Sequence, residues 1–160
     1  MSESQQFSAA VLQSWTSILE RTGKTFASFS DADLQREVAP GKNRVYYLLG
    51  HLTAVHDRLL SLLRVGDRLH PELDEEFLSK PDRSFPDENV KPEDLRKAWS
   101  EVNAALLPAL ESLTPSQWLE RHASVSEEDF AKEPHRNRLA VLLSRTNHCA
   151  YHEGQVRLAK

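Results

Sequence analysis

Cysteine is almost absent from this chain of 160 residues, because Cys149 is the only one. A single thiol cannot form a disulfide within the chain, so the fold does not depend on an oxidising compartment. The first six residues, MSESQQ, also lack the basic and apolar stretches of a secretory signal peptide. Together these absences predict a cytoplasmic protein.

An excess of basic residues is also missing. The chain has 20 Lys and Arg against 24 Asp and Glu, which gives a formal net charge of -4. This balance excludes the basic footprint of a nucleic-acid-binding protein, and no Lys/Arg cluster of the membrane-docking kind is present. The apolar run at 139–143 is far too short to span a bilayer. We therefore expect no nucleic-acid or membrane partner.

Glycine is scarce, with five in the chain, and no convincing pair of strands is present. Apolar residues instead recur at helical spacing in four long segments. These segments cover about 5–29, 42–65, 92–110 and 137–160. The pattern predicts an all-α four-helix bundle that forms one domain over residues 1–160.

The connection after the second segment is long, polar and rich in proline. Its length predicts a crossover or an active-site loop, with a short helix near Leu73 to Leu78. Pro108 lies inside the third segment, where it predicts a kink or a break. Thr114 followed by Pro115 reads as the cap of a new short turn.

The most informative motif lies in the last segment, where His148 and His152 are four residues apart. This spacing stacks both imidazoles on one helix face and supplies half of a transition-metal site. The alternative is two independent histidines, one exposed and one hydrogen-bonded in the core. Gly154, inside the same helix, suggests that another element approaches closely there.

A mononuclear site needs a third protein ligand. Glu153 points away from the histidine face, and Cys149, about 100° from His148, reads as a small buried apolar side chain. His51 and His56 both lie among leucines of the second segment, about 140° apart around the helix, so both cannot easily bind one ion. Position alone leaves the choice between them open. The remaining histidines, His70, His122 and His135, are expected at the surface.

Two motifs carry a resemblance to a known family. Residues 147–155 resemble the H-x-x-x-H-x-G-Q signature near the C-terminus of DinB-like proteins, and residues 48–52 resemble the second-helix motif of that family. The resemblance implies a DinB-like four-helix bundle with a long crossover after helix two. It also implies a homodimer and a divalent metal, often nickel or zinc, bound by His51, His148 and His152. Glu153 departs from the arginine that often follows the last histidine.

The resemblance also implies a function, because members of the superfamily include enzymes that transfer a low-molecular-weight thiol to an electrophile. The leading hypothesis is therefore a metal-dependent thiol S-transferase that acts on a small-molecule substrate in detoxification or stress response. Metal-assisted hydrolysis and a non-catalytic, metal-stabilised bundle are the alternatives. Imidazole ligands also suit Fe, Mn and Co. Polar side chains near the three histidines are candidates for substrate binding: Arg44, Tyr47, Arg58 and Tyr151.

Overall fold

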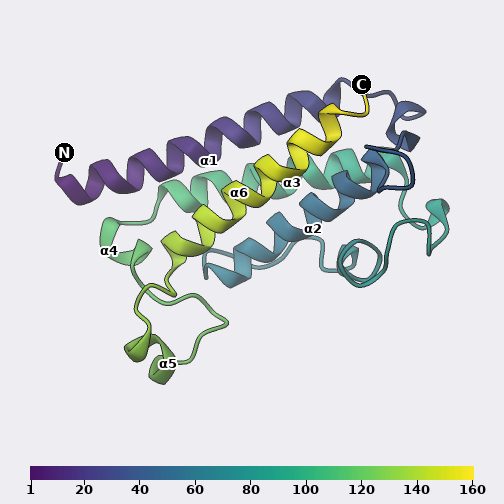
Figure 1. The fold of residues 1–160 in the computed structure, drawn as a ribbon. Coiled ribbons are helices and arrows are strands. Elements are labelled where there is room, and N and C mark those ends of the chain that lie inside the picture. The colour runs from purple at the N-terminus through teal and green to yellow at the C-terminus, as the bar shows by residue number, and fades with distance from the viewer.

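Four long helices lie along one another in the computed structural model, which describes residues 1–160 (Figure 1). They are α1 (Glu3–Ala27), α2 (Val45–Leu62), α3 (Pro92–Glu111) and α6 (Arg138–Arg157). The structure contains no strand. The predicted all-α four-helix bundle is therefore confirmed, with helix ends that differ from the predicted ends by a few residues.

Short elements occupy the connections. They are the 3₁₀ turns η1 (Asp33–Gln35) and η3 (Asp87–Asn89), the π-helical turn η2 (Glu75–Ser79), and the short helices α4 (Pro115–Trp118) and α5 (Glu127–Lys132). The helix predicted near Leu73 to Leu78 is thus present as η2, shifted by a few residues. The cap predicted at Thr114 is confirmed, because its side chain accepts a hydrogen bond from the Gln117 amide.

Pro108 does not break α3, which continues to Glu111. Proline removes one backbone donor and costs stability inside a helix. The hydrogen bond that it removes would end at the carbonyl of Ala104, an exposed residue at which water can replace it. The alternative of a break at Pro108 is therefore wrong.

The helices pack around an apolar core in two main contacts, α1 against α6 and α2 against α3 (Figure 1). Large core side chains come from every long helix and from η2. Fully buried examples are Trp15, Leu48, Leu52, Phe77, Leu95, Leu106 and Leu142. Burying each such side chain contributes roughly 1.5–3 kcal/mol, so the core holds α2 and α6 in a defined relation.

The connection between α2 and α3 runs back along α2. Gly50 near the middle of α2 touches Phe77, Tyr47 donates a hydrogen bond to the Lys80 carbonyl, and Arg44 at the start of α2 binds Asp82. As a result, α3 begins beside the start of α2. The Arg44–Asp82 pair is almost fully buried, so removing one partner would cost about 3–5 kcal/mol and release this segment.

Part of the surface of α6 is apolar. Leu142 is fully buried, whereas its neighbour Leu143 is 44% exposed in the single chain. One apolar direction of this helix therefore faces away from the bundle. None of the helices has the length and apolar character needed to cross a membrane.

Candidate metal centre

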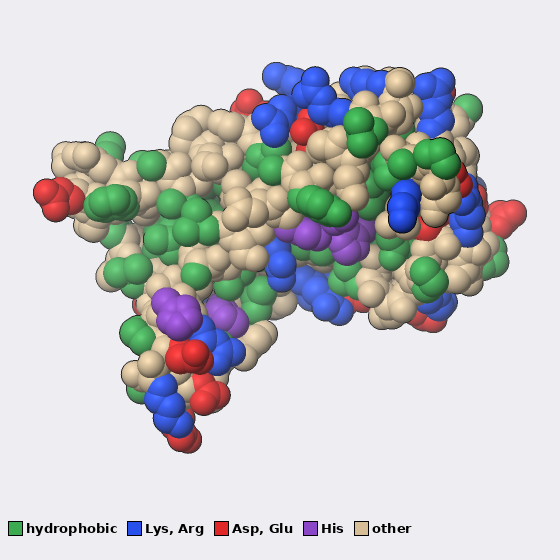
Figure 2. All heavy atoms as spheres, viewed as in Figure 1, with side chains coloured by type: hydrophobic (Ala, Val, Ile, Leu, Met, Phe, Trp, Pro, Cys, Tyr) green, Lys and Arg blue, Asp and Glu red, His purple; other side chains and the backbone are tan.

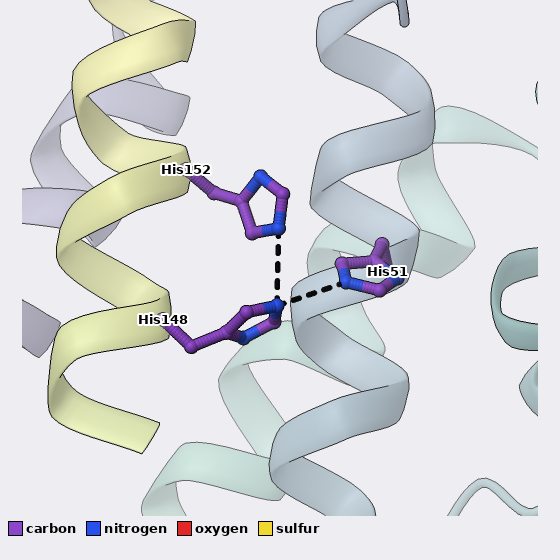
Figure 3. A group of neighbouring side chains, drawn as sticks. All are labelled: His51, His148 and His152. Carbon is purple, nitrogen blue, oxygen red and sulfur yellow. Dashed lines mark hydrogen bonds between the residues drawn. The ribbon is translucent and has the colours of Figure 1, made fainter. Parts of the chain in front are cut away.

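Three histidines from two helices converge between α2 and α6 (Figure 3). The α6 helix presents His148 and His152 one turn apart, and α2 presents His51 opposite them. His148 Nε2 lies 3.2 Å from His51 Nε2 and 3.0 Å from His152 Nε2. Nitrogens about 2.1 Å from a shared ion lie about 3.0–3.4 Å apart at octahedral or tetrahedral angles. The spacing of the imidazoles therefore fits one divalent ion.

His51 is oriented by a backbone group from the α2–α3 connection. Its Nδ1 lies 2.9 Å from the carbonyl oxygen of Phe77, which only accepts hydrogen bonds, so Nδ1 carries the proton and Nε2 keeps a lone pair. The ring of Phe77 packs against Gly50, where a Cβ would overlap it. Glycine at position 50 therefore lets η2 approach α2 closely enough for its carbonyl to reach the next residue.

His152 is oriented in the same way by its own helix. Its Nδ1 lies 2.7 Å from Gln155 Oε1, and the Gln155 amide nitrogen donates to the hydroxyl of Tyr151. The amide oxygen accepts, so Nδ1 of His152 carries the proton and Nε2 again keeps a lone pair. Such outer partners set the tautomer and direction of metal-binding imidazoles. Sequence reasoning missed both orienting groups, although Gln155 stood in the C-terminal motif.

The three facing nitrogens cannot all be satisfied by hydrogen bonds to one another. Lone pairs of His51 and His152 both face Nε2 of His148, and a single proton there could satisfy only one of them. His148 Nδ1 is buried without a hydrogen-bond partner, so no outer group orients this third ring. A shared ion would accept all three lone pairs at once, so the donor set fits a metal.

Burial and mutual repulsion keep the cluster neutral. Burial, followed by the neighbouring imidazoles and Arg145, lowers the pKa of His148 to about 4. Burial is also the main cause that lowers the pKa of His51 and of His152. Neutral imidazole is the form that binds metals, so all three side chains are ready to bind an ion at neutral pH.

The cluster opens onto solvent on one side. A cleft of about 700 Å³ is lined by His51 and His148, by the α2 side chains Val55 and Leu62, and by the loop at Ser124. No carboxylate or thiol joins the three imidazoles. Figure 2 shows histidine side chains at the surface between α6 and α2, with Lys or Arg side chains beside them. An ion held here would keep open coordination positions facing the cleft.

The competing histidine of α2 lies in the core. His56 is fully buried, its Nδ1 lies 2.9 Å from Asn103 Oδ1, and its ring packs between Trp15 and Trp99. It therefore faces α1 and α3, whereas His51 faces α6. The structure thus brings His51, and not His56, to the other two histidines.

Neighbours of the histidine pair on α6 also have defined places. Cys149 is buried against Thr22, and burial raises its thiol pKa to about 11, as expected for an inert core side chain. Glu153 is buried at the α1–α6 contact, where Thr25 donates a hydrogen bond to it. Gly154 is exposed, and no atom lies near the place that a Cβ would occupy, so the inference that another element approaches it is wrong.

Three of the other polar candidates already have partners within the fold. Arg44 is buried with Asp82 and Asp87, so it cannot reach a substrate. Tyr47 is buried and its ring stacks 6.2 Å from that of His51. Arg58 lines the cleft but pairs with Asp74. Tyr151 remains 63% exposed beside His152.

The histidines expected at the surface behave differently from one another. His135 is exposed and His122 is half-buried. His70 is also half-buried, because it bridges Glu72 and Glu101. Burial opposes protonation of His70, but the two carboxylates outweigh it and raise its pKa. His70 therefore lies at the surface as expected, but its ring is held by two carboxylates and is only partly solvated.

Comparison with known proteins agrees with this geometry. The sequence profile of the DinB superfamily matches residues 14–156. The chain belongs to the DinB superfamily. The match spans α2, the long connection and α6, and thus every side chain of the three-histidine cluster. No curated protein matches this DinB chain.

Proposed function

We propose that this DinB protein binds one divalent metal ion through Nε2 of His51, His148 and His152. The observation that carries the proposal is the convergence of three neutral imidazoles, two of them oriented by outer hydrogen bonds, with 3.0 and 3.2 Å between their nitrogens, beside an open cleft. Nickel or zinc is the expected ion, and iron, manganese and cobalt also accept imidazole ligands. Membership of the superfamily supports the same ligand set.

We further propose that the site transfers a low-molecular-weight thiol to an electrophile, in detoxification or the stress response. A divalent ion supplies positive charge that lowers the pKa of a bound thiol or water towards neutrality. The cleft lining contains no Asp or Glu that could serve as a general base for hydrolysis. Thiol transfer does not need such a base once the thiol is ionised, so the lining favours it over hydrolysis.

The residues around the three histidines would have two further roles, orienting the ligands and contacting the substrate. Phe77 and Gln155 hold two imidazoles in fixed directions, while Val55, Leu62 and Leu78 form an apolar wall suited to the body of an electrophile. With a chlorinated electrophile, the thiol sulfur forms the new C–S bond, the C–Cl bond breaks, and chloride and the thiol proton leave to solvent.

Thiol transfer is tested with monochlorobimane and purified protein loaded with Ni²⁺ or Zn²⁺. Conjugate formation is measured with cysteine, glutathione or coenzyme A, and without any thiol. We expect turnover that needs both the metal and a thiol, and that His148→Ala abolishes. Reaction with the electrophile in the absence of every thiol would instead support hydrolysis and contradict the transferase.

The non-catalytic alternative is tested by elemental analysis. Protein purified as it is, and protein refolded with Ni²⁺ or Zn²⁺, should hold close to one ion per chain. If neither preparation retains metal, both enzymatic proposals fail together.

We also propose a homodimer in the cytoplasm. The dimer is supported by the exposed apolar surface at Leu143 on α6, and the location by the buried, unpaired Cys149. Light scattering coupled to size-exclusion chromatography should give twice the chain mass. A monomeric mass across the micromolar range would contradict the dimer.

A further inference from the structure

The lining of the cleft beside the histidines is strongly one-sided in charge. It contains three arginines, Arg58, Arg68 and Arg145, and no Asp or Glu. A concave surface with charges of one sign concentrates ligands of the opposite sign. The cleft is therefore suited to an anionic group.

Two of these arginines are already neutralised. Arg58 pairs with Asp74, and Arg68 pairs with both Asp57 and Asp74. Arg145 differs from them, because its side chain forms no hydrogen bond and no ion pair with another residue although it lines the same cleft. The uncompensated positive charge of the cleft is therefore on Arg145.

Arg145 also has the right position to act on a substrate. It lies on α6 three residues before His148, so both side chains share one helix face, and both line the same cleft. A second hollow of about 410 Å³, which Arg145 and Ser124 also line, likewise has no carboxylate in its lining. Arg145, a half-buried residue, thus lines both the cleft and the second hollow. It lies about one helical turn before His148.

We infer that Arg145 binds a carboxylate of the small molecule that enters this cleft, on the thiol or on the electrophile. The inference rests on the proposed function for the identity of these two substrates. A guanidinium offers two parallel N–H donors that match the two oxygens of a carboxylate. Arg145 thereby selects carboxylate-bearing substrates and orients them towards the three histidines.

Binding of small thiols to the Zn²⁺-loaded protein tests whether the thiol carries the carboxylate that Arg145 binds. Calorimetry compares 3-mercaptopropionate with 2-mercaptoethanol, which lacks the carboxylate. We expect the wild-type protein to prefer 3-mercaptopropionate by about tenfold. Arg145→Leu should remove the preference, and Arg145→Lys should retain part of it. Arg58→Leu is the matched control, and it should keep the wild-type preference because that guanidinium is already paired with Asp74.

Binding of electrophiles to the metal-free protein tests the other source. Here 4-chloro-3-nitrobenzoate is compared with neutral 1-chloro-2,4-dinitrobenzene in the same variants. An Arg145-dependent preference for the carboxylate in either pair supports the inference and identifies its source. Equal preferences in wild type and Arg145→Leu for both pairs would overturn it, provided that the variant retains its helical circular dichroism and melting temperature.

Neither measurement requires turnover, so the two proposals can fail separately. A carboxylate preference without thiol transfer leaves the anion site in place and contradicts the transferase. Thiol transfer without a carboxylate preference supports the transferase and contradicts the anion site at Arg145.

Discussion

Two histidines five residues apart on α2 have opposite surroundings. His51 is half-buried, faces two imidazoles of α6 and borders the cleft. His56 is fully buried, contacts Asn103 and packs against two tryptophan rings. Both stand among leucines of one helix, and burial lowers the pKa of both. The difference in role therefore comes from the element across the helix and not from the local sequence.

The second ring nitrogen also has different surroundings in the two histidines. At His51 the second nitrogen is directed at a shared ion position, together with two others. At His56 the second nitrogen, Nε2, is buried without a partner, and so is the indole nitrogen of Trp15, whose ring centroid lies 4.8 Å away. The His56 ring nevertheless fills the space between two tryptophan rings, so its removal should affect folding, whereas removal of His51 affects binding.

The largest difference is expected in metal affinity. His51→Ala removes one of three ligands and should lower Ni²⁺ or Zn²⁺ affinity by more than about 100-fold. His56→Ala should leave the affinity within a few-fold of wild type while lowering the free energy of unfolding by about 3 kcal/mol. Equilibrium dialysis and urea unfolding measure the two quantities. If His56→Ala keeps its fold but no longer binds one metal ion per chain, His56 is not merely a core residue and the contrast with His51 fails.

The next largest effect is the response of stability to acid. Burial lowers the pKa of His56 from 6.5 to about 4. Between pH 6.5 and pH 4, His56 is therefore protonated in the unfolded chain and neutral in the folded chain. The free energy of unfolding should therefore fall as the pH drops from 6.5 to 4, with His56 accounting for about 3 kcal/mol. The loss should be smaller in His56→Gln, measured by urea unfolding of metal-free protein. Equal losses in the two proteins would show that His56 does not resist protonation.

A third difference concerns the two glycines that flank the ligands. Gly50→Ala forces the Phe77 ring away from α2, and should cost about 2 kcal/mol of stability and weaken metal binding. Gly154→Ala meets open space on an exposed helix face, and should stabilise the protein by about 1 kcal/mol with no effect on metal. Thermal unfolding and metal titration of the two variants measure both effects. Similar behaviour of the two variants would contradict the role given to Phe77.

The smallest expected effect concerns the orientation of His152. Gln155→Ala removes the acceptor for Nδ1 and should weaken metal binding roughly tenfold. Gln155→Glu keeps an acceptor at this position and should retain the affinity of wild type or exceed it. Competition with a coloured chelator measures both. An unchanged affinity in the alanine variant would show that packing alone orients the ring.

Most of the fold could be predicted from the sequence. Helical periodicity located all four long helices, and the capping pattern at Thr114 located α4, because these signals are local. Predictions were incomplete or wrong where a distant partner decides the outcome. His70 is held by Glu101 from α3, and Gly154 meets no neighbour although glycine inside a helix suggested one.

The sequence by itself determined that His148 and His152 share one face of a helix, because a spacing of four residues permits nothing else in an α-helix. It also carried the two motifs that resemble the DinB superfamily. That resemblance implied His51 as the third ligand, but only the tertiary structure showed that His51 meets this pair, that Phe77 orients it, and that the side chain of Arg145 has no partner. These facts depend on how α2, η2 and α6 pack against one another, and contacts between segments far apart in the chain leave no periodic signal in either segment.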